Sequence, residues 1–104
     1  MCNRYVPPGE AEIERFWHVG RSSPGPFYRS EIFPRSQGPF IRSRNGNREL
    51  VVGQWGLIPH FAKSPTLKYN TNNARSEELA DKASYRTPWK HGQRCIIPAE
   101  SFDE

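Results

Sequence analysis

The start of the chain offers the clearest chemistry in the sequence. Cys2 directly follows Met1, so removal of Met1 would leave an α-amine and a thiol on the same residue. Their reference pKa values are about 7.7 to 8.0 for the amine and about 8.5 for the thiol, so a fraction of each is a nucleophile near neutral pH. The amine can condense with an aldehyde to a Schiff base, and the thiol can then add to the imine, closing a five-membered thiazolidine ring. Cys2 is therefore a candidate nucleophile toward aldehydes.

A stretch rich in arginine suggests a partner for this chemistry. Between Arg15 and Arg48 the chain has seven arginines, no lysine and one acid, Glu31. The guanidinium fork of arginine binds phosphate oxygens through paired hydrogen bonds and stacks on bases. Aromatic residues that could also stack are interleaved with these arginines: Phe27, Tyr28, Phe33 and Phe40. With a net charge of +4, the pattern favours a surface that binds a polyanion, and the alternative is an ordinary solvated basic face.

Cysteine and histidine usage argues against other classes of site. Cys2 and Cys95 are far apart, and no Cys-x-x-Cys motif or signal-like apolar segment is present, so we expect reduced thiols and a cytoplasmic protein. No apolar stretch approaches the ~20 residues that would cross a bilayer, so we expect no membrane association. The histidines are too scattered for a metal site, and we expect neither a metal nor a cofactor. They are His18, His60 and His91.

The elements that must position these residues begin with a strand at 4–6 and a helix at 10–18. In that helix Ile13, Phe16 and Trp17 have helical spacing, and Gly20 is expected to end it. Residues 21–37 read as a loop with a short extended piece at 31–33. The clearest local structure is a hairpin of 40–44 and 48–55 around an Asn-Gly-Asn turn, in which Gly53 indicates a bulge or a close approach.

The second half of the chain is expected to carry less regular structure. Residues 60–72 read as an exposed loop, followed by a helix that begins near Glu77 with Ser76 as its N-cap. A helical turn is expected at 87–89, and a buried strand at 93–98. At 104 residues the chain is one domain or part of one. Because it stops soon after that strand, we expect it to be part of a longer domain.

Four separated segments resemble the SOS-response-associated peptidase (SRAP) family, the abasic-site processing proteins, and they occur in the family's order. They are Met1 to Tyr5, Gln54 to Pro59, Asn73 to Glu77, and Arg94 to Ala99 with Phe102 to Glu104. The resemblance covers residues 1–104 as the N-terminal part of one SRAP-like domain, roughly half of it. It implies an α+β fold with a mixed, strongly bent sheet and short flanking helices.

The resemblance also implies a function and a role for individual residues. After loss of Met1, with self-cleavage as a proposed route, Cys2 would capture the ring-opened aldehyde of an abasic site in single-stranded DNA as a thiazolidine. Asn73 would position the amine and the sugar, and Glu104 would handle protons during ring opening and imine formation. Arg75 would hold phosphate beside the lesion, and Arg4 would be a further phosphate contact. Trp55 or Phe61 would be candidates to stack on a base, although Trp55 also suits the core.

The sequence departs from the family pattern at several places, including Ser101 to Glu104, where the family has Gly-Phe-Tyr-Glu-Trp. Asn3 follows the cysteine where the family usually has glycine, and Glu31 brings a negative charge to a segment expected near DNA. The family's catalytic histidine belongs to the half of the domain that is absent from this sequence, and no histidine here matches its motif. Read without the family, Asn73 is a turn or cap residue, Arg75 a surface arginine and Glu104 a solvated carboxylate.

Three functions therefore remain open. The first is covalent capture of abasic sites in single-stranded DNA by a monomeric protein. The second is a non-catalytic module that binds single-stranded nucleic acid through arginine and aromatic contacts. The third is a thiol peptidase acting on other proteins, which ranks last because no histidine with an orienting partner can be assigned to Cys2.

Overall fold

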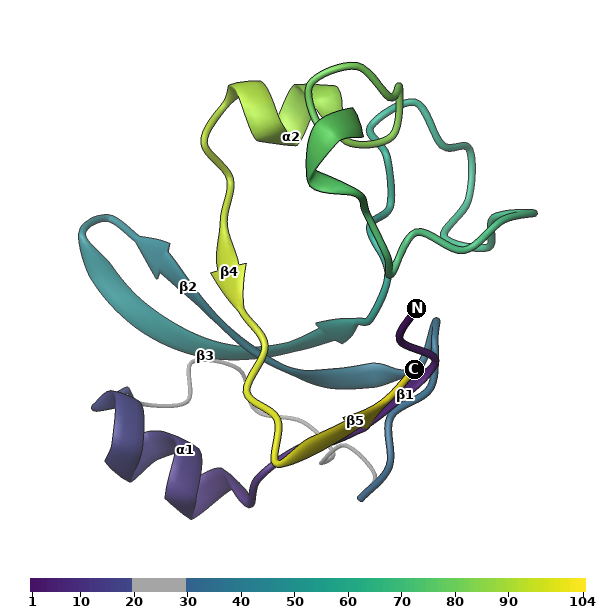
Figure 1. Ribbon diagram of the computed structural model, residues 1–104. Helices are drawn as coiled ribbons and strands as arrows, with labels where there is room; N and C mark the ends of the chain where they lie inside the picture. Colours follow the sequence, from purple (N-terminus) through teal and green to yellow (C-terminus); the bar gives the residue numbers. More distant parts are fainter. Residues whose placement is uncertain (20–29) are drawn as a thin grey trace.

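The computed structural model describes residues 1–19 and 30–104. It confirms the expected α+β class, with two short helices and two small sheets (Figure 1). Part of the predicted arginine-rich loop, including two of its aromatic residues, lies outside the described residues, as does the glycine expected to end the first helix. These residues are Gly20, Arg21, Phe27, Tyr28 and Arg29.

The first sheet joins the two ends of the chain. Strand β1 (Arg4–Val6) pairs antiparallel with β5 (Ser101–Asp103), and the N- and C-termini lie side by side at its end (Figure 1). On its other edge β1 exchanges two backbone hydrogen bonds with Ile32, of 3.0 and 2.8 Å, so the predicted extended piece at 31–33 is a single bridge. The N-terminal residues are therefore held from both sides.

The second sheet is the predicted hairpin with one short added strand. Strands β2 (Gln37–Arg44) and β3 (Asn47–Gln54) pair without a break, and β4 (Cys95–Ile96) joins the free edge of β2. The turn has two central residues, Asn45 and Gly46, with φ of 52° and 79°, as hairpin twist requires. Gly53 is a close approach and not a bulge, because an added Cβ would lie 2.7 Å from the ring of Phe40.

The core lies between this sheet and helix α1 (Glu10–Trp17). Ile13 is completely buried and packs with Ile41 of β2 and Leu50 of β3. The prediction that Phe16 shares this apolar face is wrong, since its side chain is 74% exposed. The helix ends earlier than expected, because His18 takes a left-handed conformation and the N–H of Val19 bonds to the carbonyl of Glu14 at 3.2 Å.

The rest of the chain forms a lobe, residues 56–94, that stands above the sheet (Figure 1). It contains a single 3₁₀ turn, η1 (Ser76–Glu78), and helix α2 (Arg86–Lys90). Ser76 is not an N-cap, because η1 begins at Ser76 itself and its hydroxyl contacts the side chain of Glu77. Backbone hydrogen bonds within turns, instead of a long helix, hold this lobe.

Two further expectations differ from the structure. The buried strand predicted at 93–98 is reduced to β4, whose Cys95 and Ile96 are exposed, because its partner β2 meets only these residues before the chain reaches Pro98.

We expected one mixed sheet, whereas every strand pair among residues 1–19 and 30–104 is antiparallel and the strands fall into two sheets. Strands β2 and β3 are antiparallel because a two-residue turn, which cannot connect parallel strands, joins them. In the same described ranges no helix has the length and apolar character to cross a membrane.

The position of the core predicts how stability changes when a side chain of α1 is shortened. Ile13→Ala should lower the free energy of unfolding by about 2–5 kcal/mol, because it removes a fully buried side chain between helix and sheet. Phe16→Ala, on the same helix, is the control and should cost much less, since that ring is mostly exposed. Urea denaturation followed by far-UV circular dichroism measures both. Equal losses for the two variants would contradict this placement of the core.

Candidate functional site

The backbone of Cys2 is held by the side chain of Asn73. The N–H of Cys2 donates to Asn73 Oδ1 at 3.0 Å, and Asn73 Nδ2 donates to the Cys2 carbonyl at 2.8 Å. The two residues are 71 positions apart in the sequence, so this pair of bonds ties the N-terminus to the lobe. An amide side chain is suited to this because it offers a donor and an acceptor side by side.

Two residues that the sequence did not single out complete this arrangement. Asn72 Nδ2 donates a second hydrogen bond to the Cys2 carbonyl, at 2.9 Å. The hydroxyl of Tyr85 donates to the backbone carbonyl of Asn73 at 2.7 Å, and burial raises the pKa of this hydroxyl, which keeps it protonated. In the sequence, the position of Asn72 next to Asn73 was a signal that could have identified it. No sequence signal identifies Tyr85, because its contact with Asn73 depends on the path of the lobe.

A pocket of about 340 Å³ opens beside this clamp. Met1, Asn73, Arg75 and Tyr85 line it, together with Lys82, which pairs with Glu78 at 3.2 Å. Arg75 is exposed and directly precedes η1. While Met1 is attached, the nitrogen of Cys2 is an amide and cannot form an imine. The arrangement therefore combines a half-buried Cys2, a clamp on its nitrogen and cationic side chains that could bind an anion.

Strand pairing brings Glu104 to the same end of the molecule. The N–H of Asn3 donates to the carbonyl of Asp103 at 3.1 Å, and Glu104 follows Asp103 directly. Its side chain is exposed. The pairing of β1 with β5 thus brings the backbone of Glu104 close to that of Cys2 and Asn3.

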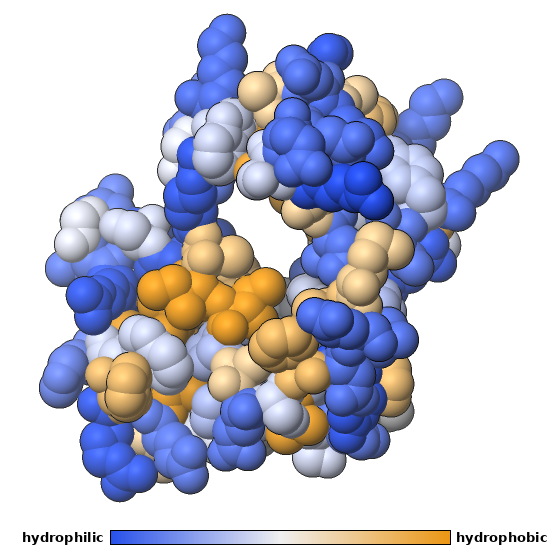
Figure 2. Space-filling model, in the orientation of Figure 1, coloured by the Kyte–Doolittle hydropathy of each residue, from blue (hydrophilic) through white to orange (hydrophobic). Residues whose placement is uncertain are grey.

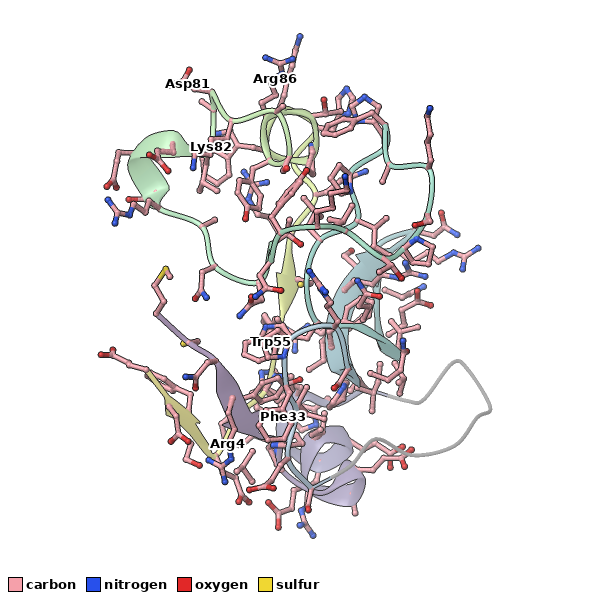
Figure 3. All side chains as sticks on the ribbon, turned by 90° about the vertical axis from the view of Figure 1, so that its right-hand side faces the viewer. Arg4, Phe33, Trp55, Asp81, Lys82 and Arg86 are labelled. Atoms are coloured by element: carbon pink, nitrogen blue, oxygen red, sulfur yellow. The ribbon has the colours of Figure 1, made fainter. Side chains whose placement is uncertain are left out.

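Arg4, which is labelled in Figure 3, lies on β1 and bonds to two carboxylates. Its Nε donates to Glu31 at 2.9 Å and its Nη1 to Asp103 at 2.7 Å. These hydrogen bonds, first that of Glu31 and then that of Asp103, raise the pKa of Arg4 above its ordinary value. A phosphate group would have to compete with both acids for this guanidinium. Glu31, noted in the sequence as a negative charge out of place near DNA, is therefore a partner of Arg4.

The candidate stacking residues lie in different surroundings. Trp55 is half-buried and meets the ring of Tyr5 edge-on, with centroids 4.8 Å apart, which fits the core. Phe61 is 50% exposed and contacts His60 edge-on. Figure 3 shows Trp55 near Arg4 and Phe33, in the half of the molecule opposite to Lys82 and Arg86.

The second thiol lies in different surroundings from Cys2. Cys95 is on β4 and is exposed as a residue, but the surrounding protein partly desolvates its thiol, which raises the pKa of that thiol and lowers its thiolate fraction at neutral pH. In the part of the chain that the structure describes, no group of three His, Cys, Asp or Glu side chains is arranged to hold a metal ion. Within the same ranges, no hydrogen bond joins a histidine to Cys2, as a thiol peptidase would require.

Comparison with known proteins identifies the family. The sequence profile described as SOS response associated peptidase (SRAP) matches residues 1–104. The chain belongs to this family. A crystal structure of a protein from Bordetella bronchiseptica, with 31% sequence identity, superposes with a TM-score of 0.79 over 97% of this chain and 49% of that one. The expected family and fold class are thus confirmed.

The similar proteins of known name are described as abasic site processing proteins. YoqW of Bacillus subtilis is 38% identical over all of this chain and 47% of its own length. YobE of the same organism is also 38% identical, over 48% of its length. The chicken protein HMCES is 33% identical over 68% of this chain and 24% of its own. The chain therefore spans about half the length of the Bacillus proteins it matches.

Proposed function

We propose that the chain captures abasic sites in single-stranded DNA through Cys2 once Met1 has been removed. The observation that carries this proposal is the clamp of Asn73 on Cys2. It fixes the nitrogen that becomes the α-amine, and the adjoining pocket contains Arg75, which suits a phosphate beside the lesion. The names of the similar proteins, abasic site processing, support the same substrate.

The reaction uses both nucleophiles of Cys2. The unprotonated amine attacks the aldehyde of the ring-opened sugar, and loss of one water molecule gives the imine. The thiol then adds to the imine carbon, its proton passes to nitrogen, and the thiazolidine ring closes. Asn73 Oδ1, which accepts a hydrogen bond from this nitrogen at 3.0 Å, would orient the amine and leave its lone pair directed toward the pocket.

Glu104 is our candidate for the proton transfers. Opening the cyclic hemiacetal of the sugar requires removal of a proton from its hydroxyl and delivery of one to the ring oxygen, and dehydration to the imine requires a proton donor. A carboxylic acid near the reacting atoms can serve all three steps. The pairing of β1 with β5 brings the backbone of Glu104 near Cys2, and its exposed side chain is free to turn toward bound sugar.

Removal of Met1 is part of the proposal, because the amide nitrogen of an internal residue cannot form an imine. Self-cleavage is one route to it, and hydrolysis by a separate aminopeptidase is the other. Met1 is 85% exposed, so the residue to be removed lies at the surface for either route. A non-catalytic single-stranded nucleic acid binding module is the competing function, and it predicts affinity without a covalent product.

The thiol nucleophile can be assigned by a pair of matched variants. Incubation with single-stranded DNA that carries one abasic site should give a covalent adduct, seen as a slower band on a denaturing gel. Cys2→Ala should abolish it, because the variant has no thiol at the N-terminus, whereas Cys95→Ala should retain it. Binding of the same DNA by the wild-type chain without any adduct, once Met1 is absent, would favour the binding module.

The role of Glu104 can be tested by measuring the rate of adduct formation. Glu104→Gln should slow adduct formation by about 10²-fold, the usual contribution of a general acid–base. Glu100→Gln, at the other end of β5, is the matched control and should react like the wild type. The defect of Glu104→Gln should shrink on an acyclic aldehyde analogue that needs no ring opening. Equal rates for the two variants on the abasic substrate would remove Glu104 from the mechanism.

A further inference from the structure

Removal of Met1 would place the α-amine of Cys2 beside a small pocket. Met1 is one of the residues that line the pocket of about 340 Å³ next to the Asn73 clamp. Since Met1 is bonded to the nitrogen of Cys2, its removal leaves the new α-amine at the edge of this space. Pockets of this size enclose small molecules. The amine could therefore meet the aldehyde of a small free molecule as well as that of a sugar within DNA.

The charged side chains of the pocket favour an anionic ligand. Arg75 and Lys82 line it together with one acid, Glu78, so two positive charges against one negative leave a net charge of +1. Lys82 pairs with Glu78 at 3.2 Å, but both side chains are exposed, and exposed ion pairs are weak. A phosphate group could therefore displace Glu78 from Lys82 and bind Arg75 through paired hydrogen bonds.

Uncharged polar groups on the same wall suit a hydroxylated ligand. The hydroxyls of Tyr69 and Ser84 both belong to the pocket and lie 3.2 Å apart, and a hydroxyl can donate and accept hydrogen bonds. Figure 2 shows that the lobe, at the top of the view, is mostly hydrophilic, whereas an apolar area lies over the sheet below it. The pocket is thus built largely from the part of the molecule in which a polar ligand is expected.

We propose that Cys2, once Met1 has been removed, also captures small phosphorylated aldehydes of the size of a triose phosphate. Arg75 and Lys82 bind the phosphate of such a ligand, and its aldehyde reaches Cys2. The inference shares Cys2 and the loss of Met1 with the proposed function, but it needs no DNA.

The chemical step is the same ring closure on a different aldehyde. The α-amine of Cys2 adds to the aldehyde carbon, and one water molecule leaves as the imine forms. The thiol then adds to the imine carbon, its proton passes to the nitrogen, and no oxidant or reductant takes part. Because both nucleophiles of Cys2 are consumed, the modified protein can form no adduct with abasic DNA.

The test compares glyceraldehyde 3-phosphate with glyceraldehyde. The chain is prepared with Cys2 as its first residue by cleavage of an N-terminal fusion, and intact mass spectrometry follows the gain of one aldehyde less one water. A synthetic peptide of residues 2–5, Cys-Asn-Arg-Tyr, reports the intrinsic reactivity of each aldehyde. Cys2→Ala should form no stable product.

The expected result is a preference for phosphate that the peptide lacks. The ratio of the rate with the phosphorylated aldehyde to the rate with glyceraldehyde should be about tenfold larger for the protein than for the peptide. This corresponds to about threefold for each of the two cations, the scale of an exposed charge pair. Lys82→Gln should therefore lower the ratio about threefold, and Lys82→Gln with Arg75→Gln should lower it to the value of the peptide.

Lys90→Gln is the matched control. It removes the same charge from the same lobe, at the end of α2, but Lys90 does not line the pocket. Its ratio should equal that of the wild type. Lys82 is exposed, so Lys82→Gln should keep the wild-type circular dichroism spectrum, and its rate with glyceraldehyde should not change.

The outcomes separate this inference from the proposed function. A ratio for the protein equal to that of the peptide, or equal ratios for Lys82→Gln and Lys90→Gln, overturns the phosphorylated-aldehyde pocket, whether or not abasic DNA forms an adduct with the same preparation. A higher ratio that falls in Lys82→Gln supports it. The same result in a protein that forms no adduct with abasic DNA would support the pocket and reject DNA as the substrate.

Discussion

The structure depends on the exchange of two hydrogen bonds between the Asn73 side chain and the backbone of Cys2. A chain end is usually mobile unless it is tied down, and a nucleophile at a chain end is useful only if it is held. Here β1 is fixed on one side by β5 and on the other by the bridge to Ile32. Asn73 then fixes the next residues. The lobe and the paired termini thus meet at Cys2.

This constraint explains why the lobe needs so little regular structure. Its task is to present Asn72 and Asn73 at the N-terminus, and turns with internal hydrogen bonds are sufficient for that. Tyr85 bonds to the backbone of Asn73, and Thr71 to that of Leu57. Each such hydrogen bond contributes about 1 kcal/mol to the net stability of the fold, and each also excludes alternative conformations of the loop.

The sequence predicted the elements whose signals are local. The hairpin follows from its Asn-Gly turn and flanking strands, and α1 from acids in its first turn and the buried Ile13. The predictions failed where tertiary contacts determine the burial of a side chain or the length of a strand. Phe16 has suitable spacing but faces solvent, and β4 is short because β2 meets only Cys95 and Ile96. For the site, the motif around Asn73 was visible, whereas the contact of Tyr85 and the pairing of Arg4 with Glu31 depend on chain paths that no local pattern encodes.

The central claim is that Cys2 reacts through its amine and its thiol together, from the position in which Asn73 holds it. The most direct measurement is peptide-level mass spectrometry of the adduct formed with abasic single-stranded DNA, after proteolysis, nuclease digestion and alkylation of free thiols. The account predicts an N-terminal peptide that begins at Cys2, carries the sugar aldehyde less one water, and takes up no alkylating agent at Cys2. A modified peptide that still begins with Met1, or one whose Cys2 thiol remains open to alkylation, would contradict it.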